Sequence, residues 1–592
     1  MKQKIFALFL ILCGLCLNLK AETQGDVVGR VLDDSGAPLA GATVQILHAK
    51  GGVITDEDGY FRIPYSKDGA VRVKVSFVGY QTQTFVLKAD ERKGEQHVLR
   101  LQPDATALDQ VVVTATRTPK ALKDAPVVTR LITANDIKIA DATNIQDLLT
   151  EQMPGLEFGY AMNQETSLNM NGFGGNAVLF LVDGERLAGE TMDNVDYNRL
   201  NLDNVGRIEI VKGAASALYG ANAVAGVINI ISRENSEPWT ANVNTRYNNF
   251  NKEWRHGGSF SFNAGKWNSQ TSIQRTTSDE VQLTSPFDTE SNILHIYGGE
   301  TFNVKERLTY KLSDKVKLIG RGGYFARVSN RGNYDDHYKD YSAGLKTVMN
   351  LSENDNLEIS YGFDQYDKAR YVNDERTHDH DYTNRQNIIR ALYSHIFGKN
   401  TLTAGADFLN DFLTTYQFAN NGSKTQNSYD AFAQFDYNPL QWLNIVASLR
   451  HDYFSASSQH ATTGRLALMT KWKSFSIRAN YAGGFRAPTL KEMYMNFDMA
   501  GMQMIYGNPD LKPEKSNNFN LALEHTGRVK NAGFLTGQYS LTLMGYYNKY
   551  DKRITTEDYA DYTPGTGQPD VASRYCNEDG VEVSGIDFSA QY

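Results

Sequence analysis

The side chains best suited to ligand chemistry are methionines gathered in one stretch, FRAPTLKEMYMNFDMAGMQMIYGNPDL. They are Met493, Met495, Met499, Met502 and Met504. A thioether sulfur serves as an axial ligand of haem iron and also suits Cu(I). Methionine is equally an adaptable apolar contact, and it is a weaker metal ligand than histidine. Both interpretations stay open, and the candidate ligand contacts in this stretch are Arg486, Met499, Met502, Met504 and Tyr506.

Two further segments offer similar donors. Met162 and Met170 lie in YAMNQETSLNMNGF, and His378 and His380 lie in THDHDY. The histidines are two residues apart, so in a strand they would share one face. Contact with a metal or with haem is one interpretation, and a solvated, charge-rich loop is the other.

Motifs for the common catalytic chemistries are missing from the sequence. It contains no HExxH, GxSxG or P-loop pattern. GFGGN, at Gly172–Asn176, leads into an apolar run and does not open a helix, which argues against a dinucleotide-binding loop. The acidic DEDG at 56–59 lacks the later glutamate of an EF-hand and indicates a turn. We expect a protein that is not an enzyme and has no cofactor or metal site of its own.

Composition narrows the class further. The chain has 592 residues, 60 Lys and Arg against 68 Asp and Glu, and no basic cluster, which excludes nucleic acid as a partner. Its 33 tyrosines suit the rims of membrane barrels, where one end of the ring is apolar and the other wet. Beyond the first twenty residues there is no long apolar run, so a helical membrane protein is not expected.

The N-terminus, MKQKIFALFLILCGLCLNLKA, has a basic start and a short apolar run. This pattern predicts a secretory signal peptide at residues 1–21. Its removal would take Cys13 and Cys16 with it, leaving Cys576 and no internal disulfide in the mature chain.

Residues 24–102 alternate short strand patterns with turn signals such as Asp58-Gly59. About seven strands in so short a region predict a small β-sandwich. Residues 105–126 read as a linker that carries an isolated β-prone run, Val111–Val113. This run is either an edge strand of the sandwich or a strand offered to another protein by edge addition.

Residues 127–235 mix helical and strand signals and predict a compact α+β domain. Thr133, Asn135 and Thr143 are candidate helix N-caps. The last part, IEIVKGAASALYGANAVAGVINIIS, has two apolar runs around Gly220 and several alanines. Side chains this small form no core of their own, so the segment must pack closely against another surface.

From residue 237 to 592 the sequence alternates with a period of two, as in LEISYGFDQY. About sixteen segments of about ten residues or more repeat the pattern, the length that a tilted strand needs to cross a bilayer. Short connections alternate with long polar ones, expected at 276–300, 328–340, 366–382, 417–428, 486–512 and 553–580. This asymmetry predicts a transmembrane antiparallel β-barrel of the outer membrane.

A barrel of this size has a lumen too wide for its own side chains to fill, so another domain must close it. Here the sequence resembles the TonB-dependent outer-membrane receptors, over about residues 105–592. LLTEQMPGL, VLFLVDGERL and IEIVKGAASALYGANAVAGVINIIS resemble successive motifs of the internal plug, and FRAP with NPDL resembles a pair of barrel-loop motifs. Residues 24–102 resemble the carboxypeptidase-regulatory-like domain of some such receptors. DQVVVTATR resembles the TonB box, which assigns that role to Asp109, Gln110, Val111, Val112, Val113, Thr114 and Ala115.

Two features depart from the family pattern. Asn171 and Lys212 stand where plug motifs often have arginine, so charge contacts with the barrel wall are expected to differ. The family's barrel has 22 strands, so we expect about four to six strands beyond Tyr592. Because IDFSAQY ends on an aromatic residue, as complete barrels do, a full smaller barrel is the alternative.

The resemblance implies a monomer in the lipid of the Gram-negative outer membrane, with its front domain facing the periplasm. It implies active import of a scarce, bulky ligand, driven by a TonB-type partner that captures the box by strand addition. An iron complex, either haem or a ferric siderophore, is the expected ligand. A cobalamin importer, and a glycan importer or surface adhesin, are the alternatives. An open porin is excluded because a plug would block flow.

Overall fold

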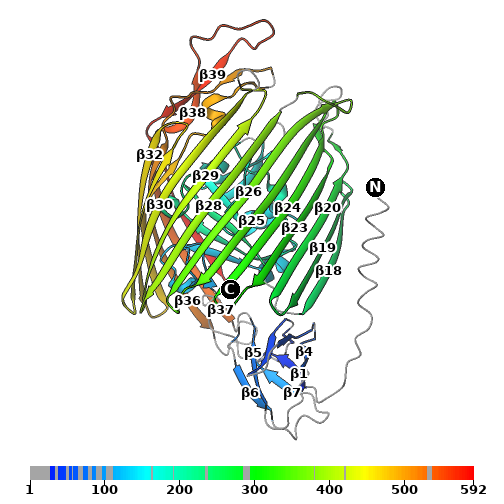
Figure 1. Cartoon of the computed structure of the whole chain (residues 1–592), viewed down its shortest axis with the longest axis vertical. Coiled ribbons are helices and arrows are strands. Elements are labelled where there is room, and N and C mark those ends of the chain that lie inside the picture. Colours follow the sequence, from blue (N-terminus) through cyan, green and yellow to red (C-terminus); the bar gives the residue numbers. More distant parts are fainter. Residues whose placement is uncertain are drawn as a thin grey trace. The chain divides into compact units, whose positions relative to one another are not determined.

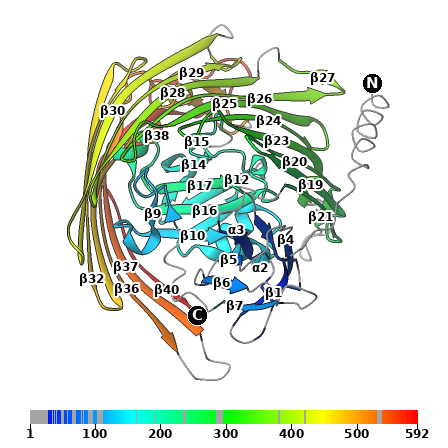
Figure 2. The ribbon, with the colours of Figure 1, turned by 60° about the horizontal axis from the view of Figure 1, so that its bottom comes forward.

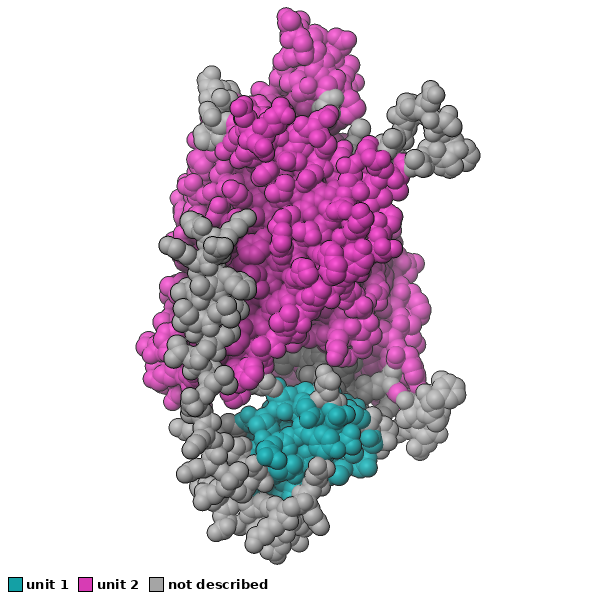
Figure 3. Space-filling view, turned by 90° about the vertical axis from the view of Figure 1, so that its right-hand side faces the viewer, with its two compact units in different colours: residues 1–107 teal, residues 108–592 magenta. Residues whose placement is uncertain are grey.

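The computed structural model describes residues 27–592 apart from 34–35, 37, 40, 48–51, 57, 64–70, 78–79, 81–82, 88–96, 102–110, 162–163, 191–192, 234–237, 284–293, 379–380, 419–421, 500 and 530–536. The predicted signal peptide lies outside the described residues. The chain forms two compact units, residues 1–107 and residues 108–592 (Figure 3).

The first unit has seven described strands in two sheets. One sheet has the order β4-β1-β7 and the other β3-β2-β5-β6, around buried side chains such as Val31, Val44 and Val73. Asp56 accepts hydrogen bonds from the backbone N–H groups of Asp58 and Tyr60, so the acidic segment is a turn. The strands are β1 (Val27–Leu32), β2 (Thr43–Ile46), β3 (Gly52–Ile54), β4 (Tyr60–Ile63), β5 (Val71–Ser76), β6 (Gln83–Leu87) and β7 (His97–Arg100).

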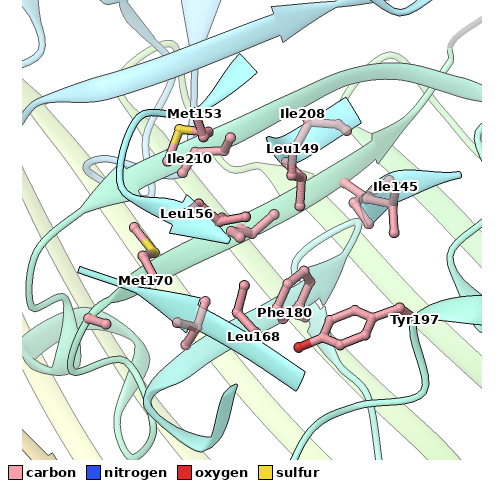
Figure 4. Packing of buried hydrophobic residues seen from close by; sticks show 14 of the residues in the cluster. Ile145, Leu149, Met153, Leu156, Leu168, Met170, Phe180, Tyr197, Ile208 and Ile210 are labelled. Carbon is pink, nitrogen blue, oxygen red and sulfur yellow. The ribbon is translucent and has the colours of Figure 1, made fainter. Parts of the chain in front are cut away.

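The plug is built on a five-stranded sheet of order β10-β16-β17-β14-β15, with a second sheet of order β11-β12-β13. Thr133 and Asp136 form a capping box at α2, and Asn135 lies inside that helix. Asn144, and not Thr143, caps α3. Figure 4 shows the core, where Leu149, Phe180 and Ile208 meet from different elements. The elements are β10 (Thr129–Thr133), α2 (Ala134–Ala140), α3 (Ile145–Gln152), β11 (Leu156–Tyr160), β12 (Thr166–Met170), β13 (Phe173–Gly174), β14 (Val178–Val182), β15 (Glu185–Arg186), β16 (Val205–Lys212), α4 (Ser216–Tyr219) and β17 (Gly226–Ser232).

The barrel wall is one antiparallel sheet of seventeen described strands, of which β27 (Glu375–Arg376) has only two residues (Figure 1). The others are β18 (Trp239–Asn248), β19 (Glu253–Ala264), β20 (Trp267–Ser278), β23 (Gly299–Lys311), β24 (Val316–Asn330), β25 (Asp335–Asn350), β26 (Asp355–Val372), β28 (Tyr382–Phe397), β29 (Asn400–Thr414), β30 (Ser423–Leu440), β31 (Leu443–Phe454), β32 (Gln459–Trp472), β33 (Phe475–Arg486), β36 (Glu514–Val529), β37 (Gly537–Asp551) and β40 (Val581–Gln591).

Alternation along each strand sorts the side chains to two faces. In β26, Ser360 and Asp364 are buried toward the plug, while Ile359 and Tyr361 are exposed on the outer face. The outer face is therefore apolar, as a lipid-facing surface must be. None of the described helices has the length and hydropathy needed to span a membrane.

The sheet curves around the plug, which lies on its concave side (Figure 2). Within the described residues, β18 and β40 each pair with a neighbour on one side only. The number of long strands agrees with the sequence count and is smaller than the 22 of the family pattern. The mainly β fold class, with a membrane barrel and an internal plug, is confirmed.

Three of the expected long connections are wrong. β24 and β25 are joined by residues 331–334 alone, and β26 and β30 also run into segments expected as loop. In these strands the backbone hydrogen bonds between neighbours continue past the lipid-facing apolar residues. The polar residues beyond them keep the same alternation of side chains between the two faces. Long connections remain between β20 and β23, β33 and β36, and β37 and β40.

Candidate functional site

The strand of the TonB-box segment belongs to the second unit. β8 (Val111–Val112) pairs antiparallel with β9 (Lys120–Ala121), so the interpretation as an edge strand of the sandwich is wrong. Asp109 and Gln110 lie outside the described residues. Val112 is fully buried in a cluster with plug side chains. A strand that is already paired and buried cannot be added to a partner's sheet without first being released.

A buried carboxylate holds the rest of the box. Glu209 Oε2, in β16, accepts hydrogen bonds from the backbone N–H groups of Val113 (2.9 Å) and Thr114 (2.7 Å) and from the Thr114 hydroxyl (2.6 Å). Arg207 Nε lies 2.7 Å from the other oxygen of Glu209. The Tyr219 hydroxyl donates to the Thr114 carbonyl, so Thr114 and Ala115 are sealed inside the plug.

The linker beyond the box is fixed to the barrel wall. The Arg117 guanidinium lies between the rings of Tyr219 and Phe432, 4.5 and 4.9 Å from their centroids. Burial lowers the pKa of Arg117 to about 10, so the group keeps its charge at neutral pH. Further along, Lys120 Nζ lies 2.6 Å from Asp436 Oδ2 of β30.

The Gly/Ala-rich segment explains how closely the plug approaches the wall. α4 is buried along its whole length against strands β30–β33, and the Phe485 N–H donates to the Ser216 hydroxyl. A Cβ on Gly220 would come within 2.5 Å of Arg450 Nη2, and a Cβ on Gly213 within 2.2 Å of Asn520 Nδ2. Only glycine leaves room for the wall side chains at these positions.

The opposite side of the plug meets the wall through charges. Arg199 Nη2, at the end of a short 3₁₀ turn (Tyr197–Arg199), lies 2.5 Å from Asp340 Oδ2 and 2.9 Å from Asp364 Oδ1. Arg327 of β24 pairs with Glu165 and Asp196 of the plug at 3.1 and 3.0 Å. A cavity of about 140 Å³ lies here between the plug and strands β20–β29.

A small outer-loop cluster lies on the long-connection side. It comprises α5 (Leu490–Tyr494), β34 (Asn496–Asp498), β35 (Met504–Tyr506), β38 (Arg553–Asp558) and β39 (Ala572–Glu578), and the four strands form one sheet of order β34-β35-β39-β38.

Lys491 connects this cluster to the plug. Its ammonium lies 2.8 Å from Asp193 Oδ1 and 3.3 Å from Glu190 Oε1. Burial, together with the nearby Asp193 and Glu492 carboxylates, raises the pKa of Glu190 to about 7, while Lys491 opposes that rise. The Glu190 and Asp193 carboxylates hold the pKa of Lys491 well above its ordinary value, against the effect of burial.

Most of the methionine candidates are packing residues. Met170 is 1% exposed in the plug core, so its prediction as a ligand donor is wrong. Met493 and Met495 are buried beside Leu413 and Phe418.

Two other positions in the loop remain available. Met504 is buried in β35, while Met499 is half-buried against a small apolar cluster. Met502 is 45% exposed. Met162 lies outside the described residues.

The polar candidates also include one buried residue and one that is partly exposed. Arg486 is 1% exposed, and Glu492 and Glu514 each bind its guanidinium at 2.9 Å, so its prediction as a ligand contact is wrong. It instead anchors the loop after β33, because a buried cation needs its countercharges close by. Tyr506 is partly exposed and contacts the rings of Tyr559 and Tyr562.

His378 is exposed and stacks on Tyr416 with ring centroids 3.7 Å apart. Its Nδ1 lies 3.1 Å from Asp381 Oδ1. His380 lies outside the described residues, so the shared face of the two histidines stays a prediction. Within the described part of the chain, no group of three His, Cys, Asp or Glu side chains is arranged to hold a metal ion.

The residues that connect the parts were not found from the sequence. No ligand-binding or catalytic motif singled out Glu209, Arg199 or Lys491, and the residues that they contact are distant in the chain. One signal was present for Glu209, since a charged residue in the middle of an apolar strand requires a buried partner.

Comparison with known proteins agrees with this architecture. The family model of the TonB-dependent receptor-like β-barrel matches residues 240–592, and the TonB-dependent receptor plug domain matches residues 121–227. A carboxypeptidase-D-regulatory-like domain matches residues 27–113.

Similar curated proteins have related names. An iron-regulated outer membrane virulence protein of Vibrio cholerae is 24% identical over 484 residues, covering 76% of this chain and 70% of that protein. The vitamin B12 transporter BtuB of Photobacterium profundum is 25% identical over 512 residues, covering 83% and 77%.

Solved structures share the fold. The ferric enterobactin receptor PfeA of Pseudomonas aeruginosa, as a mutant, matches with a TM-score of 0.66 at 17% identity, covering 82% of this chain and 79% of that one. The Serratia marcescens hemophore receptor HasR, in a complex with its hemophore and haem, matches with a TM-score of 0.63 at 13% identity, covering 79% of each.

Such receptors lie in the Gram-negative outer membrane, and the N-terminal domain lies in the periplasm. They work with TonB and bind bulky ligands. The barrel match spans more than half of the chain, and the plug match covers the domain found inside the curved sheet. This chain therefore belongs to the TonB-dependent receptor family.

Proposed function

We propose that this receptor imports a scarce iron complex, either haem or a ferric siderophore, with energy supplied by a TonB-type partner in the periplasm. The observation that carries the proposal is the plug that fills the concave side of the barrel and buries the box beneath Glu209. A plug this firmly bound makes passive flow through the barrel implausible, so transport needs work done on the box.

The outer-loop cluster supports a large, partly aromatic ligand. Tyr506, Tyr559 and Tyr562 form a ring cluster, and the Arg574 guanidinium lies 5.8 Å from the Tyr559 ring centroid. Aromatic faces and a cation suit a flat or aromatic chelate that carries negative charge. Met502, four residues before Tyr506 in the sequence, is exposed.

Two sets of relatives favour different ligands. The iron-regulated protein, the ferric enterobactin receptor and the haem-bound hemophore receptor favour iron complexes. The vitamin B12 transporters make cobalamin the second candidate.

The ligand is identified by growth and binding together. A deletion strain and its parent are compared on haemin, ferric enterobactin and cyanocobalamin, each as the limiting source. We expect the deletion strain to fail on one iron complex, and the purified receptor to bind that same compound, with a shift of the Soret band if it is haemin. Failure on cyanocobalamin alone would replace the iron proposal by the second candidate, and normal growth on all three would overturn both.

The energy requirement is tested at the box. Val113→Pro removes a backbone N–H and prevents the residue from joining a ladder, whereas Val113→Ala keeps the N–H. We expect Val113→Pro to bind the compound normally and to lose at least tenfold in uptake, with Val113→Ala close to the parent. Undiminished uptake by Val113→Pro would contradict strand addition at this segment.

The methionine contact is tested separately, because unchanged affinity after Met499→Ala and Met502→Ala would remove it from the proposal.

A further inference from the structure

The plug meets the barrel wall through two unlike faces. We define the apolar face as Leu179, Leu218, Ala223 and Val227, which pack with Leu392, Phe432, Val446 and Ala467 of the wall. We define the polar face as Glu165, Glu185, Asp196 and Arg199, which pair with residues of strands β24–β28.

The cavity lies on the polar face and is built to hold water. It is lined by five basic and five acidic side chains. Three polar atoms that line it are buried without a hydrogen-bond partner in the described structure. They are Gln270 Oε1, Asn303 Oδ1 and Asn201 Nδ2. Buried polar atoms of this kind bind water when a cavity gives them room.

The part of the wall that borders this cavity contains glycines in place of larger residues. Gly344 of β25 and Gly362 of β26 lie directly opposite each other in the register, and Gly323 of β24 also lines the cavity. A Cβ on Gly362 would come within 3.6 Å of Glu185 Oε2, which shows that this glycine faces the plug. Because glycine has no side chain, the inner surface of the wall is recessed along three neighbouring strands.

The two faces differ in what it costs to separate them. Exposing apolar surface costs about 25 cal/mol per Å². Charges that separate across a hydrated gap recover the solvation that they lost on burial, which offsets much of the lost attraction. On the apolar side the wall cation Arg450 is paired with Asp430 and Asp452, both also in the wall, and its single described hydrogen bond to the plug is to the Leu218 carbonyl at 3.4 Å.

From these observations we infer that the solute passes along the polar face, between the plug and strands β23–β26, while the apolar face stays seated and acts as the hinge side. This inference rests on the proposed import function. A cavity of about 140 Å³ is far smaller than the several hundred Å³ of sites that hold bulky ligands, so it must widen during passage. Its balanced charge lets either anionic or cationic complexes pass without a deep electrostatic trap.

Reversible staples test the inference in a Cys576→Ser background. On the apolar side, Ala214→Cys with Gly484→Cys forms a disulfide, because a Cβ at Gly484 lies 3.4 Å from Ala214 Cβ, close to the usual separation of about 3.8 Å. On the polar side, Glu185→Cys with Gly362→Cys is bridged by a short bifunctional methanethiosulfonate. Uptake of haemin, ferric enterobactin and cyanocobalamin is measured before and after reduction.

We expect the polar staple to lower uptake at least tenfold, with recovery after reduction, and the apolar staple to leave uptake within twofold of the reduced form. The reverse pattern, or equal loss with both staples, would overturn the inference. Absence of uptake by the reduced variants and by the parent would instead contradict the import function.

A second measurement needs no ligand. Single cysteines Gly344→Cys at the cavity and Ala467→Cys on the apolar side are labelled with a maleimide in the purified receptor at rising urea concentration. We expect the cavity cysteine to react at a lower urea concentration than the apolar one. Simultaneous reaction, or earlier reaction of Ala467→Cys, would overturn the inference even if the transported compound stays unknown.

Discussion

On one side of the plug, Leu218 and the small residues around it pack against Phe432 and Val446. On the other side, Arg199 pairs with Asp340 and Asp364 beside a cavity. Both sides fill the barrel, but they do so by different chemistry. Close apolar packing makes the first side resistant to separation, while ion pairs beside a cavity make the second side able to exchange partners. A plug with both faces can stay attached to the barrel and still open a path.

The largest effect is expected at Gly220, where the plug lies close against the apolar side of the wall. Gly220 has φ 76° and ψ −150°, a conformation that only glycine adopts readily, and its Cβ position is occupied by Arg450. Gly220→Val should destabilise the seated plug by about 4 kcal/mol, from backbone strain and overpacking together. Limited proteolysis of the purified receptor measures plug release. Gly344→Ala on the polar side is the matched control and should stay resistant, since its nearest neighbour is the flexible Arg321 side chain.

A smaller loss is expected from deleting apolar volume. Leu218 is fully buried, and Leu218→Ala should cost about 3 kcal/mol in the free energy of plug unfolding. Asn303→Ala on the polar side loses one hydrogen bond, to the Arg199 carbonyl, and should cost about 1 kcal/mol. Urea titration followed by hydrogen exchange of plug amides measures both. Equal losses would remove the energetic distinction between the two faces.

The ion cluster gives a third way to sharpen the comparison. Arg199→Met leaves two wall carboxylates without their cation and should cost about 2 kcal/mol, less than in a fully packed interior because the cavity beside them has room for water. Adding Asp340→Asn and Asp364→Asn should restore most of the lost stability, since no uncompensated charge is left. The same urea titration decides the matter, and failure of the triple variant to recover would show that this cluster stabilises the plug by its geometry.

The smallest effect concerns the contact between the plug and the outer loops. The pKa of Glu190 is raised to about 7 from an ordinary value of 4.5, so its contribution to stability is present at low pH and is lost as pH rises through about 7. Stability should fall by at most about 2 kcal/mol between pH 5 and pH 7. Glu190→Gln should remove that slope, while Asp193 keeps its pairing with Lys491. Thermal unfolding across this pH range measures the effect, and an unchanged slope in Glu190→Gln would assign the titration to another group.

The fold was largely predictable because periodicity and turn signals are local. Alternation gave the long strands near 357–364, and the Gly/Ala segment correctly indicated a close neighbour. Loop lengths were less predictable, since the ladder from β24 into β25 continues through polar residues that carry no sign of where the membrane ends.

The candidate site was less predictable than the fold. Met170 and Arg486 have side chains that bind ligands in many proteins, yet one packs in a core and the other is held between two glutamates. Nothing in the spacing of Met170 distinguishes a buried face of β12 from an exposed loop. For Arg486, the partner Glu514 is 28 residues away and meets it only because β33 and β36 are neighbours.

The sequence by itself determined the elements of this receptor: which segments alternate, where glycine permits close approach, and where a box-like strand precedes the plug. Only the tertiary structure decided which side of the plug packs by apolar contacts and which by ion pairs beside a cavity, and that Glu209 holds Thr114. The physical reason is that periodicity and backbone preference act over a few residues, whereas solvation of a buried charge depends on groups that the fold brings together from distant parts of the chain.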